Sequence, residues 1–110
     1  MAAPGNYTGP LCPLAGTGYP KPEDGSKRAV DLSDYPNWYL RNKGSKGVNI
    51  SLGQEPKGDE NHGEASVNDY YLASGEWVVL CVGPSGRDWL HILYEDGADL
   101  ALAPLLTSTG

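Results

Sequence analysis

From residue 28 onward, apolar and polar positions follow a period close to two, which is the pattern of half-buried β-strands. Pro104 is expected to end the last strand, because proline has no N–H to donate to a ladder. Short strands at this spacing, joined by Gly-containing turns, predict an all-β domain: a small antiparallel β-sandwich, a jelly roll or a small barrel. The predicted strands are 29–32, 38–41, 48–52, 68–72, 76–82, 89–94 and 98–103.

Several connectors carry hairpin signals. Residues 42–47 are turn-rich and of hairpin length, residues 73–75 end in Gly75, and Asp96-Gly97 is a common hairpin dipeptide. Segment 76–82 is apolar on both faces and is expected to be a central strand. On strands 38–41 and 48–52, the alternation buries Trp38, Leu40, Val48, Ile50 and Leu52, and it places Tyr39, Arg41, Asn49 and Ser51 in solvent.

The first 26 residues differ in character from the rest. Ten of these 26 positions are Gly or Pro, so neither a helix nor a paired strand is expected. A flexible linker would lack the interspersed apolar residues Tyr7, Leu11, Leu14 and Tyr19. We therefore expect an extended N-terminal arm, 1–26, that docks these side chains on a neighbouring surface, followed by a sandwich domain, 27–110. A disordered tail is the alternative.

Composition narrows the range of partners. The 110 residues fit one domain, and a net charge of −6, from 8 basic and 14 acidic residues, argues against nucleic acid or anionic lipid. No apolar run approaches the roughly 20 residues of a membrane helix, and no secretory signal is expected at the N-terminus. Cys12 and Cys81 are expected to be free thiols rather than one bridge, with Cys81 a small buried hydrophobe.

No pattern of catalytic residues emerges. His91 lies on a strand and is expected at a half-buried or interface position, and Gly83-Pro84-Ser85-Gly86 lacks the spacing of a nucleophile elbow. The best metal candidate is 59–64, with four oxygen-bearing side chains and His62, but its glycine is out of register for a calcium loop. A solvated loop is the preferred interpretation. We expect no enzyme, no cofactor and no bound metal.

Aromatic residues favour a binding function. Seven Tyr and three Trp exceed what so small a core can hide. A flat sugar or another protein would suit exposed rings, and an acidic chain with an adhesive arm fits the protein better. The tyrosines expected in the arm or facing outward are Tyr7, Tyr19, Tyr35, Tyr39 and Tyr71.

Three strings in residues 35–82 resemble small structural proteins of tailed bacteriophages. They are Trp38-Tyr39-Leu40-Arg41-Asn42, then Val48-Asn49-Ile50-Ser51-Leu52-Gly53, then the stretch from Tyr70 to Leu80 with its Ser74-Gly75-Glu76 turn. Domains of that group are β-sandwiches that decorate or cement the outside of capsids, and related ones occur in tails and fibres. A Pro/Gly-rich arm fits cement proteins, whose arms reach across neighbouring capsomers.

The resemblance implies a non-enzymatic virion protein on the capsid exterior, with the major capsid protein and neighbouring copies, as a homotrimer, for partners. Tyr7, Leu11, Leu14 and Tyr19 are the expected arm anchors, with Tyr39 and Tyr71 as further partner-binding residues. Deletion of residues 1–26 is expected to leave a folded sandwich that no longer binds capsids. The alternative is a carbohydrate-binding or tail-fibre sandwich module.

Overall fold

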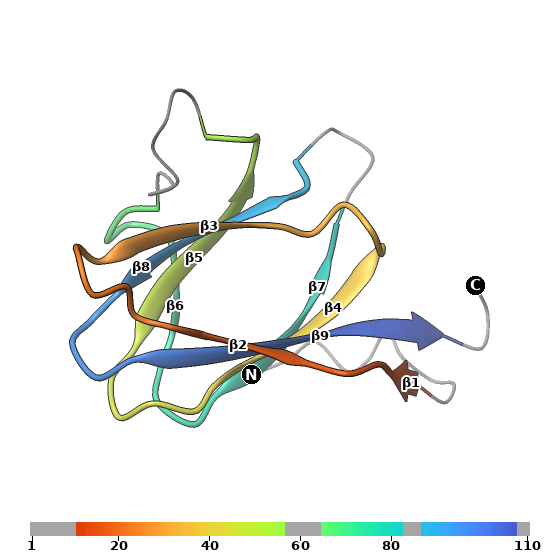
Figure 1. The fold of residues 1–110 in the computed structure, drawn as a ribbon, viewed down its shortest axis with the longest axis horizontal. Coiled ribbons are helices and arrows are strands. Elements are labelled where there is room, and N and C mark those ends of the chain that lie inside the picture. The colour runs from red at the N-terminus through yellow and green to blue at the C-terminus, as the bar shows by residue number, and fades with distance from the viewer. Residues whose placement is uncertain (1–10, 57–64, 83–86, 108–110) are drawn as a thin grey trace.

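The computed structural model describes residues 11–56, 65–82 and 87–107, which form nine strands in two antiparallel sheets and no helix (Figure 1). The all-β prediction is therefore confirmed. The strands are β1 (Leu11–Pro13), β2 (Thr17–Pro20), β3 (Lys27–Asp31), β4 (Asn37–Asn42), β5 (Val48–Gly53), β6 (Tyr70–Leu72), β7 (Trp77–Cys81), β8 (Trp89–Tyr94) and β9 (Asp99–Thr107).

The strand pairs are nested along the chain. β5 pairs with β6, β4 with β7, β3 with β8 and β2 with β9, as in one long hairpin. Two further pairs, β4 with β9 and β5 with β8, roll that hairpin into two stacked sheets. The first sheet has the order β1-β9-β4-β7 with β2 also on β9, and the second has the order β3-β8-β5-β6. This arrangement is a jelly roll, one of the folds that the sequence predicts.

The core lies between the two sheets. Alternation along the strands turns every second side chain inward, and packing the two inner faces together removes them from water. Leu40 and Leu102 are opposite each other on β4 and β9, and Ile50 and Ile92 are opposite each other on β5 and β8. The buried cluster comprises Val30, Leu32, Leu40, Val48, Ile50, Leu72, Leu90, Ile92, Tyr94, Ala98, Leu100 and Leu102.

The three expected hairpins are wrong, because each connector crosses from one sheet to the other. Residues 43–47 lead from β4 to β5, 73–76 from β6 to β7, and 95–98 from β8 to β9, and in each case the two strands belong to different sheets. Gly75 and Gly97 have φ of 80° and 99°, as tight turns require. Such turn residues redirect the chain, but burial of both inner faces decides which strands pair.

Asn42 holds two of these crossings together. It is fully buried where β4 ends, and its Nδ2 donates to the carbonyl oxygens of Lys46, at 2.7 Å, and Leu72, at 3.1 Å. Its Oδ1 accepts the N–H of Gly44 at 3.0 Å. One amide side chain thus replaces the backbone partners that the crossing segments leave unpaired.

Two predicted positions differ in the structure. Segment 76–82 was expected to be central, but β7 pairs only with β4 and lies at the edge of its sheet. Asn49 was expected in solvent, but it is 7% exposed and donates from Nδ2 to the carbonyl of Asp69 at 3.0 Å. The segment that leads into β6 covers Asn49, and this long-range contact cannot be predicted from the alternation of residues within one strand.

The expectation of no paired strand in residues 1–26 is wrong for β1 and β2, which both pair with β9. Pro104 does not end β9, which continues to Thr107. The carbonyl of Pro104 accepts the N–H of Leu14 at 2.9 Å. Since the N and O of one residue point to the same side of an antiparallel strand, the missing N–H of Pro104 falls beside 14–16, where the neighbouring edge is interrupted.

The two cysteines are too far apart to form a bridge. Cys12 is on β1 and Cys81 on β7, with β9 and β4 between them, so the strands are about 14 Å apart at normal spacing. A disulfide requires a Cα separation below about 7 Å. Both thiols are free, as expected, but Cys81 is exposed, and the expectation that it is buried is wrong.

Candidate docking surface

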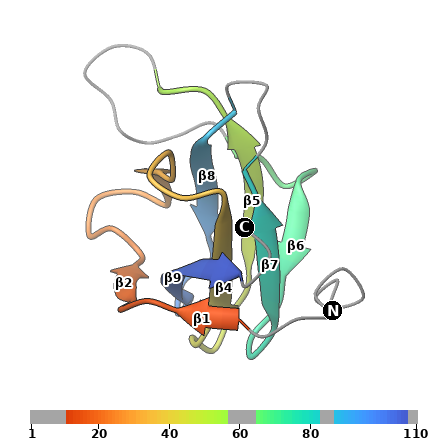
Figure 2. The ribbon, with the colours of Figure 1, turned by 90° about the vertical axis from the view of Figure 1, so that its right-hand side faces the viewer.

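β6 and β7, each at the edge of its sheet, run on the same side of the molecule (Figure 2). Among the described residues, four exposed large hydrophobic side chains lie there: Val67 (77% exposed), Tyr70 (49%), Tyr71 (49%) and Trp77 (41%). Another, Leu106, lies on β9. Single exposed apolar residues are ordinary, but a group of them marks an interaction surface. We call these four residues the β6–β7 surface.

An apolar groove lies beside Tyr70 of this surface. It has a volume of about 230 Å³, below the roughly 300–1,000 Å³ of most small-molecule sites. Tyr70 enters it from β6, and Val78 and Leu80 enter it from β7, so the groove lies where the edges of the two sheets diverge. Its size and lining suit a few apolar side chains of a protein partner. The remaining lining residues are Ile50, Ser51, Leu52 and Leu90.

Tyr71 is fixed in its exposed position by Glu95. The Tyr71 hydroxyl donates to Oε1 of Glu95 at 2.8 Å, and the same oxygen accepts the N–H of Gly47 at 2.9 Å. The Gly47 N–H, followed by the Tyr71 hydroxyl, holds the pKa of Glu95 below its ordinary value, and the bond to Glu95 raises the pKa of Tyr71. A Cβ at Gly47 would overlap the Tyr71 ring, so the ring requires glycine there.

An aromatic pair continues the surface onto the outer face of the first sheet. The rings of Tyr39, on β4, and Trp77, on β7, have centroids 5.7 Å apart and an interplanar angle of 36°. Tyr39 is half-buried and lies opposite Val79 of β7. Rings packed in this way lose little conformational entropy when a partner covers them.

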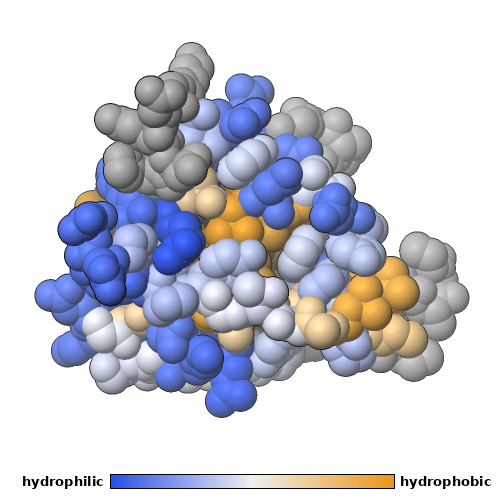
Figure 3. All heavy atoms as spheres, in the orientation of Figure 1, coloured by the Kyte–Doolittle hydropathy of each residue, from blue (hydrophilic) through white to orange (hydrophobic). Residues whose placement is uncertain are grey.

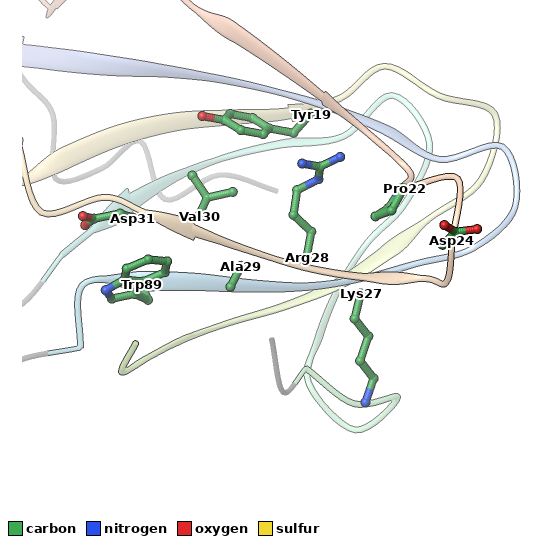
Figure 4. Close-up of a pocket in the computed structure, with 9 residues that line it drawn as sticks. All are labelled: Tyr19, Pro22, Asp24, Lys27, Arg28, Ala29, Val30, Asp31 and Trp89. Atoms are coloured by element: carbon green, nitrogen blue, oxygen red, sulfur yellow. The ribbon is translucent and has the colours of Figure 1, made fainter. Parts of the chain in front are cut away.

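A second, larger hollow opens between β2 and β3, at the other edges of the two sheets. Its volume is about 580 Å³. Apolar atoms are visible at its floor (Figure 3). Figure 4 shows Val30 and Arg28 pointing from β3 toward Tyr19 of β2, whereas Lys27 points away. The residues that line it are Tyr19, Pro22, Asp24, Lys27, Arg28, Ala29, Val30, Asp31 and Trp89.

Arg28 ties the two walls of this hollow together. Its Nη2 donates to the carbonyl of Pro20 at 3.0 Å, and its Cζ lies 5.7 Å from the centre of the Tyr19 ring, within cation–π range. The contacts of the Arg28 guanidinium therefore hold β2 against β3, and its buried Nε is left without a hydrogen-bond partner among the described residues.

The six residues expected to bind a partner are dispersed. Tyr7 and the side chain of Leu11 lie outside the described residues. Leu14 and Tyr19 are half-buried within their own domain, with Tyr19 packed against the core. Tyr39 is half-buried beside Trp77, and Tyr71 is exposed on the β6–β7 surface. Tyr71 and, in part, Tyr39 remain accessible to a partner, whereas Leu14 and Tyr19 already have contacts inside the chain.

Val67, Tyr70 and Trp77 were missed by the sequence analysis. Val67 is an apolar residue in an otherwise polar turn, which is a usable signal. Tyr70 alternates with Tyr71 and lies on the same face of β6 as the buried Leu72, but β6 is an edge strand, so its inner face opens to solvent. Trp77 belongs to segment 76–82, which was expected to be a central strand because it is apolar on both faces.

Groups that could perform chemistry do not converge in the described residues. His91 is 2% exposed, and its Nε2 lies 2.8 Å from the carbonyl oxygen of Gln54. In the described ranges, no three His, Cys, Asp or Glu residues are grouped as metal ligands would be. The candidate loop 59–64, with His62, and the turn 83–86 lie outside the described residues. Nor do the described residues form a helix long and apolar enough to cross a bilayer.

Comparison with protein-family models, curated proteins and solved structures finds no significant match to this chain. A jelly roll by itself hosts many functions.

Proposed function

We propose that this protein is a non-enzymatic virion structural protein, a decoration or cement protein that binds the major capsid protein on the exterior of a tailed-phage head. The observation that carries this proposal is the β6–β7 surface, where Val67, Tyr70, Tyr71 and Trp77 stand in solvent and Tyr70, with Val78 and Leu80, lines an apolar groove. Trp and Tyr are enriched among the few residues that carry most of the binding energy of protein interfaces. A protein partner fits this surface better than a small molecule does.

The resemblance to phage decoration proteins supports the same surface. It covers residues 35–82, and its last string runs through β6 and β7. The rigid jelly roll would present these side chains without an ordering cost, which favours binding. The arm takes a smaller part than the sequence analysis expects, because β1 and β2 belong to the sandwich sheet.

Such a protein acts by mass action. If it binds only the expanded capsid lattice, each bound copy stabilises that lattice by an amount that rises with its free concentration. A single contact of this small size is weak, but a shell offers many identical sites, and a partner that spans two of them gains avidity. No chemistry is needed.

Cosedimentation with expanded capsids, assembled from the major capsid protein of the same genome, tests the proposal. We expect the wild-type protein to pellet with the shells, and Val67→Asp or Tyr70→Ser to weaken binding by at least about tenfold. Leu106→Asp is the matched control, since Leu106 is 45% exposed but lies on β9. Failure of the wild type to bind, or equal weakening by the control, would contradict the proposal.

A carbohydrate-binding function is the second candidate, and the hollow between β2 and β3 favours it. Tyr19 and Trp89 could stack on a sugar ring there, and the Nε of Arg28 is a free buried donor. A glycan array would give sugar-dependent binding that Trp89→Ala abolishes. Binding to capsids without any response to sugars would favour the decoration protein instead.

A further inference from the structure

The free edges of the two sheets are protected unequally. An edge strand exposes unpaired backbone groups, and proteins normally blunt such edges with short strands, prolines or charges. β6 has three residues, the edge of β1 and β2 is interrupted and carries Pro13 and Pro20, and β3 carries Lys27, Arg28 and Asp31. β7 has five residues, Trp-Val-Val-Leu-Cys, with no charge and no proline. It is the edge without protection among the described strands.

The hydrogen bonds to β4 show which backbone groups of β7 are free. The backbone N–H of Asn42 donates to the carbonyl of Glu76, and the backbone N–H of Val82 donates to the carbonyl of Pro36. Even-numbered residues of this segment therefore turn their N–H and C=O toward β4. Trp77, Val79 and Cys81 turn theirs away from the sheet, where no described strand receives them.

We propose that β7 pairs with β7 of a second copy, antiparallel, across a two-fold axis at Val79. This register places Val79 opposite Val79 and Trp77 opposite Cys81, and it allows about six backbone hydrogen bonds between the two chains. On the inner face, Val78 lies opposite Leu80. Every side-chain pair along the edge is apolar on both faces. The strand is therefore complementary to a second copy of itself, as an isologous contact requires.

Charge and shape favour a copy of this chain as the occupant. The molecule carries a net charge of −6, but 77–82 holds no charged residue, so two copies approach here without opposed carboxylates along the strand. Val78 and Leu80 also line the apolar groove, so an added strand continues the wall of that groove and covers part of it. The pair joins the two first sheets into one continuous sheet.

The inference goes beyond the proposed function and can fail independently of it. Self-pairing concerns the protein alone in solution, whereas the proposed function concerns binding to a shell. A two-fold edge contact closes as a dimer, so the homotrimer expected from the sequence would need a different, heterologous contact.

Charge-swap variants at Val79 provide the first test. Val79 is half-buried on the outer face, where a longer side chain can extend into solvent. In sedimentation velocity up to about 1 mM, we expect the wild type to dimerise, and Val79→Lys or Val79→Glu alone to weaken the dimer at least about tenfold, because like charges then lie opposite each other. A mixture of the two variants restores the dimer. Ala29→Lys, at the matching outward-facing position of β3, leaves it unchanged.

Cross-linking provides the second test and detects a weak dimer. In a Cys12→Ser, Cys81→Ser background, Val79→Cys places two thiols on residues whose Cα atoms are about 5.5 Å apart in the pair, within disulfide range. Oxidation then gives a covalent dimer, while Ala29→Cys in the same background stays monomeric. A wild type that is monomeric at every concentration, or equal cross-linking of the two variants, would overturn the inference.

Discussion

The hydroxyl of Tyr94 donates a 2.8 Å hydrogen bond to the carbonyl oxygen of Tyr19, 75 positions earlier in the chain. Tyr94 ends β8 of the second sheet, and Tyr19 belongs to β2 of the first, so the bond joins the two sheets. It also places the end of the Pro/Gly-rich segment inside the domain. The segment from β2 onward is thus a structural part of the sandwich.

Tyr94→Phe should destabilise the protein by about 1 kcal/mol, because it removes this hydrogen bond between the two sheets. The loss should be largest locally, at β2. Urea unfolding gives the free energy of unfolding, and hydrogen exchange at 17–20 gives the local effect. Tyr35→Phe is the control, since the Tyr35 hydroxyl makes no hydrogen bond within the described part of the chain. An unchanged exchange rate at β2 would contradict the role assigned to Tyr94.

The buried hydroxyl of Tyr94 also predicts that the stability of the protein depends on pH in the alkaline range. Burial raises the pKa of Tyr94 to about 12, with Arg28 acting in the opposite direction. Because the unfolded chain loses this proton near pH 10 and the folded protein holds it longer, the free energy of unfolding should fall as pH rises from about 10 to about 12. Tyrosinate absorbance of wild type and Tyr94→Phe shows whether the last-titrating tyrosine disappears.

Truncations separate the two parts of the N-terminal segment. Deletion of residues 1–10 leaves every described strand intact, so the melting temperature should change little. Deletion of residues 1–26 removes β1, β2 and the Tyr19 contact with the core, and should destabilise the domain by several kcal/mol or prevent folding. This result would differ from the folded sandwich that the sequence analysis expects. Equal melting temperatures for both truncations would show that β2 does not support the core.

Asn42→Ala should cost about 2–4 kcal/mol, because the carbonyls of Lys46 and Leu72 and the N–H of Gly44 lose their partner where two segments cross between the sheets. Chemical denaturation measures the loss. Asn68→Ala, at an exposed turn position, is the matched control and should lie within about 0.5 kcal/mol of wild type. Similar losses for the two variants would contradict the role of Asn42.

The Tyr71–Glu95 contact predicts that the stability of the protein depends on pH in the acid range. The pKa of Glu95 is depressed in the folded state, so its contribution to stability is present at neutral pH and is lost as pH falls through that lowered value. Tyr71→Phe removes one of the two donors and should move the pKa of Glu95 up toward its ordinary value. NMR titration of the side-chain carboxyl carbon measures this shift. Gly47→Ala should raise it too, because its Cβ displaces the Tyr71 ring.

The sequence predicted the later strands well, because the alternation of β3, β4, β5, β8 and β9 reports a sheet with one buried face. It did not predict which strands pair with each other. Turns such as 95–98 have the residues of a hairpin, yet they connect different sheets, since nested long-range pairing is fixed by packing and not by the turn. Pro104 in β9 depends on the gap in the neighbouring edge at 14–16, which no local pattern shows.

The candidate surface was only partly predictable. Tyr71 was expected to face outward, and it does. Tyr70 and Trp77 required the knowledge that β6 and β7 are edge strands on the same side of the molecule, which depends on the order of strands in both sheets. Tyr19 was taken for an intermolecular anchor because an apolar residue among prolines has no visible intramolecular partner until β9 and Tyr94 are in place.

An electron cryo-microscopy map of the native particle tests the central claim most directly. The account predicts this jelly roll at lattice positions repeated across the outside of the shell, with Val67, Tyr70, Tyr71 and Trp77 turned toward the major capsid protein. Density confined to the tail, or a particle shell without this protein, would contradict it.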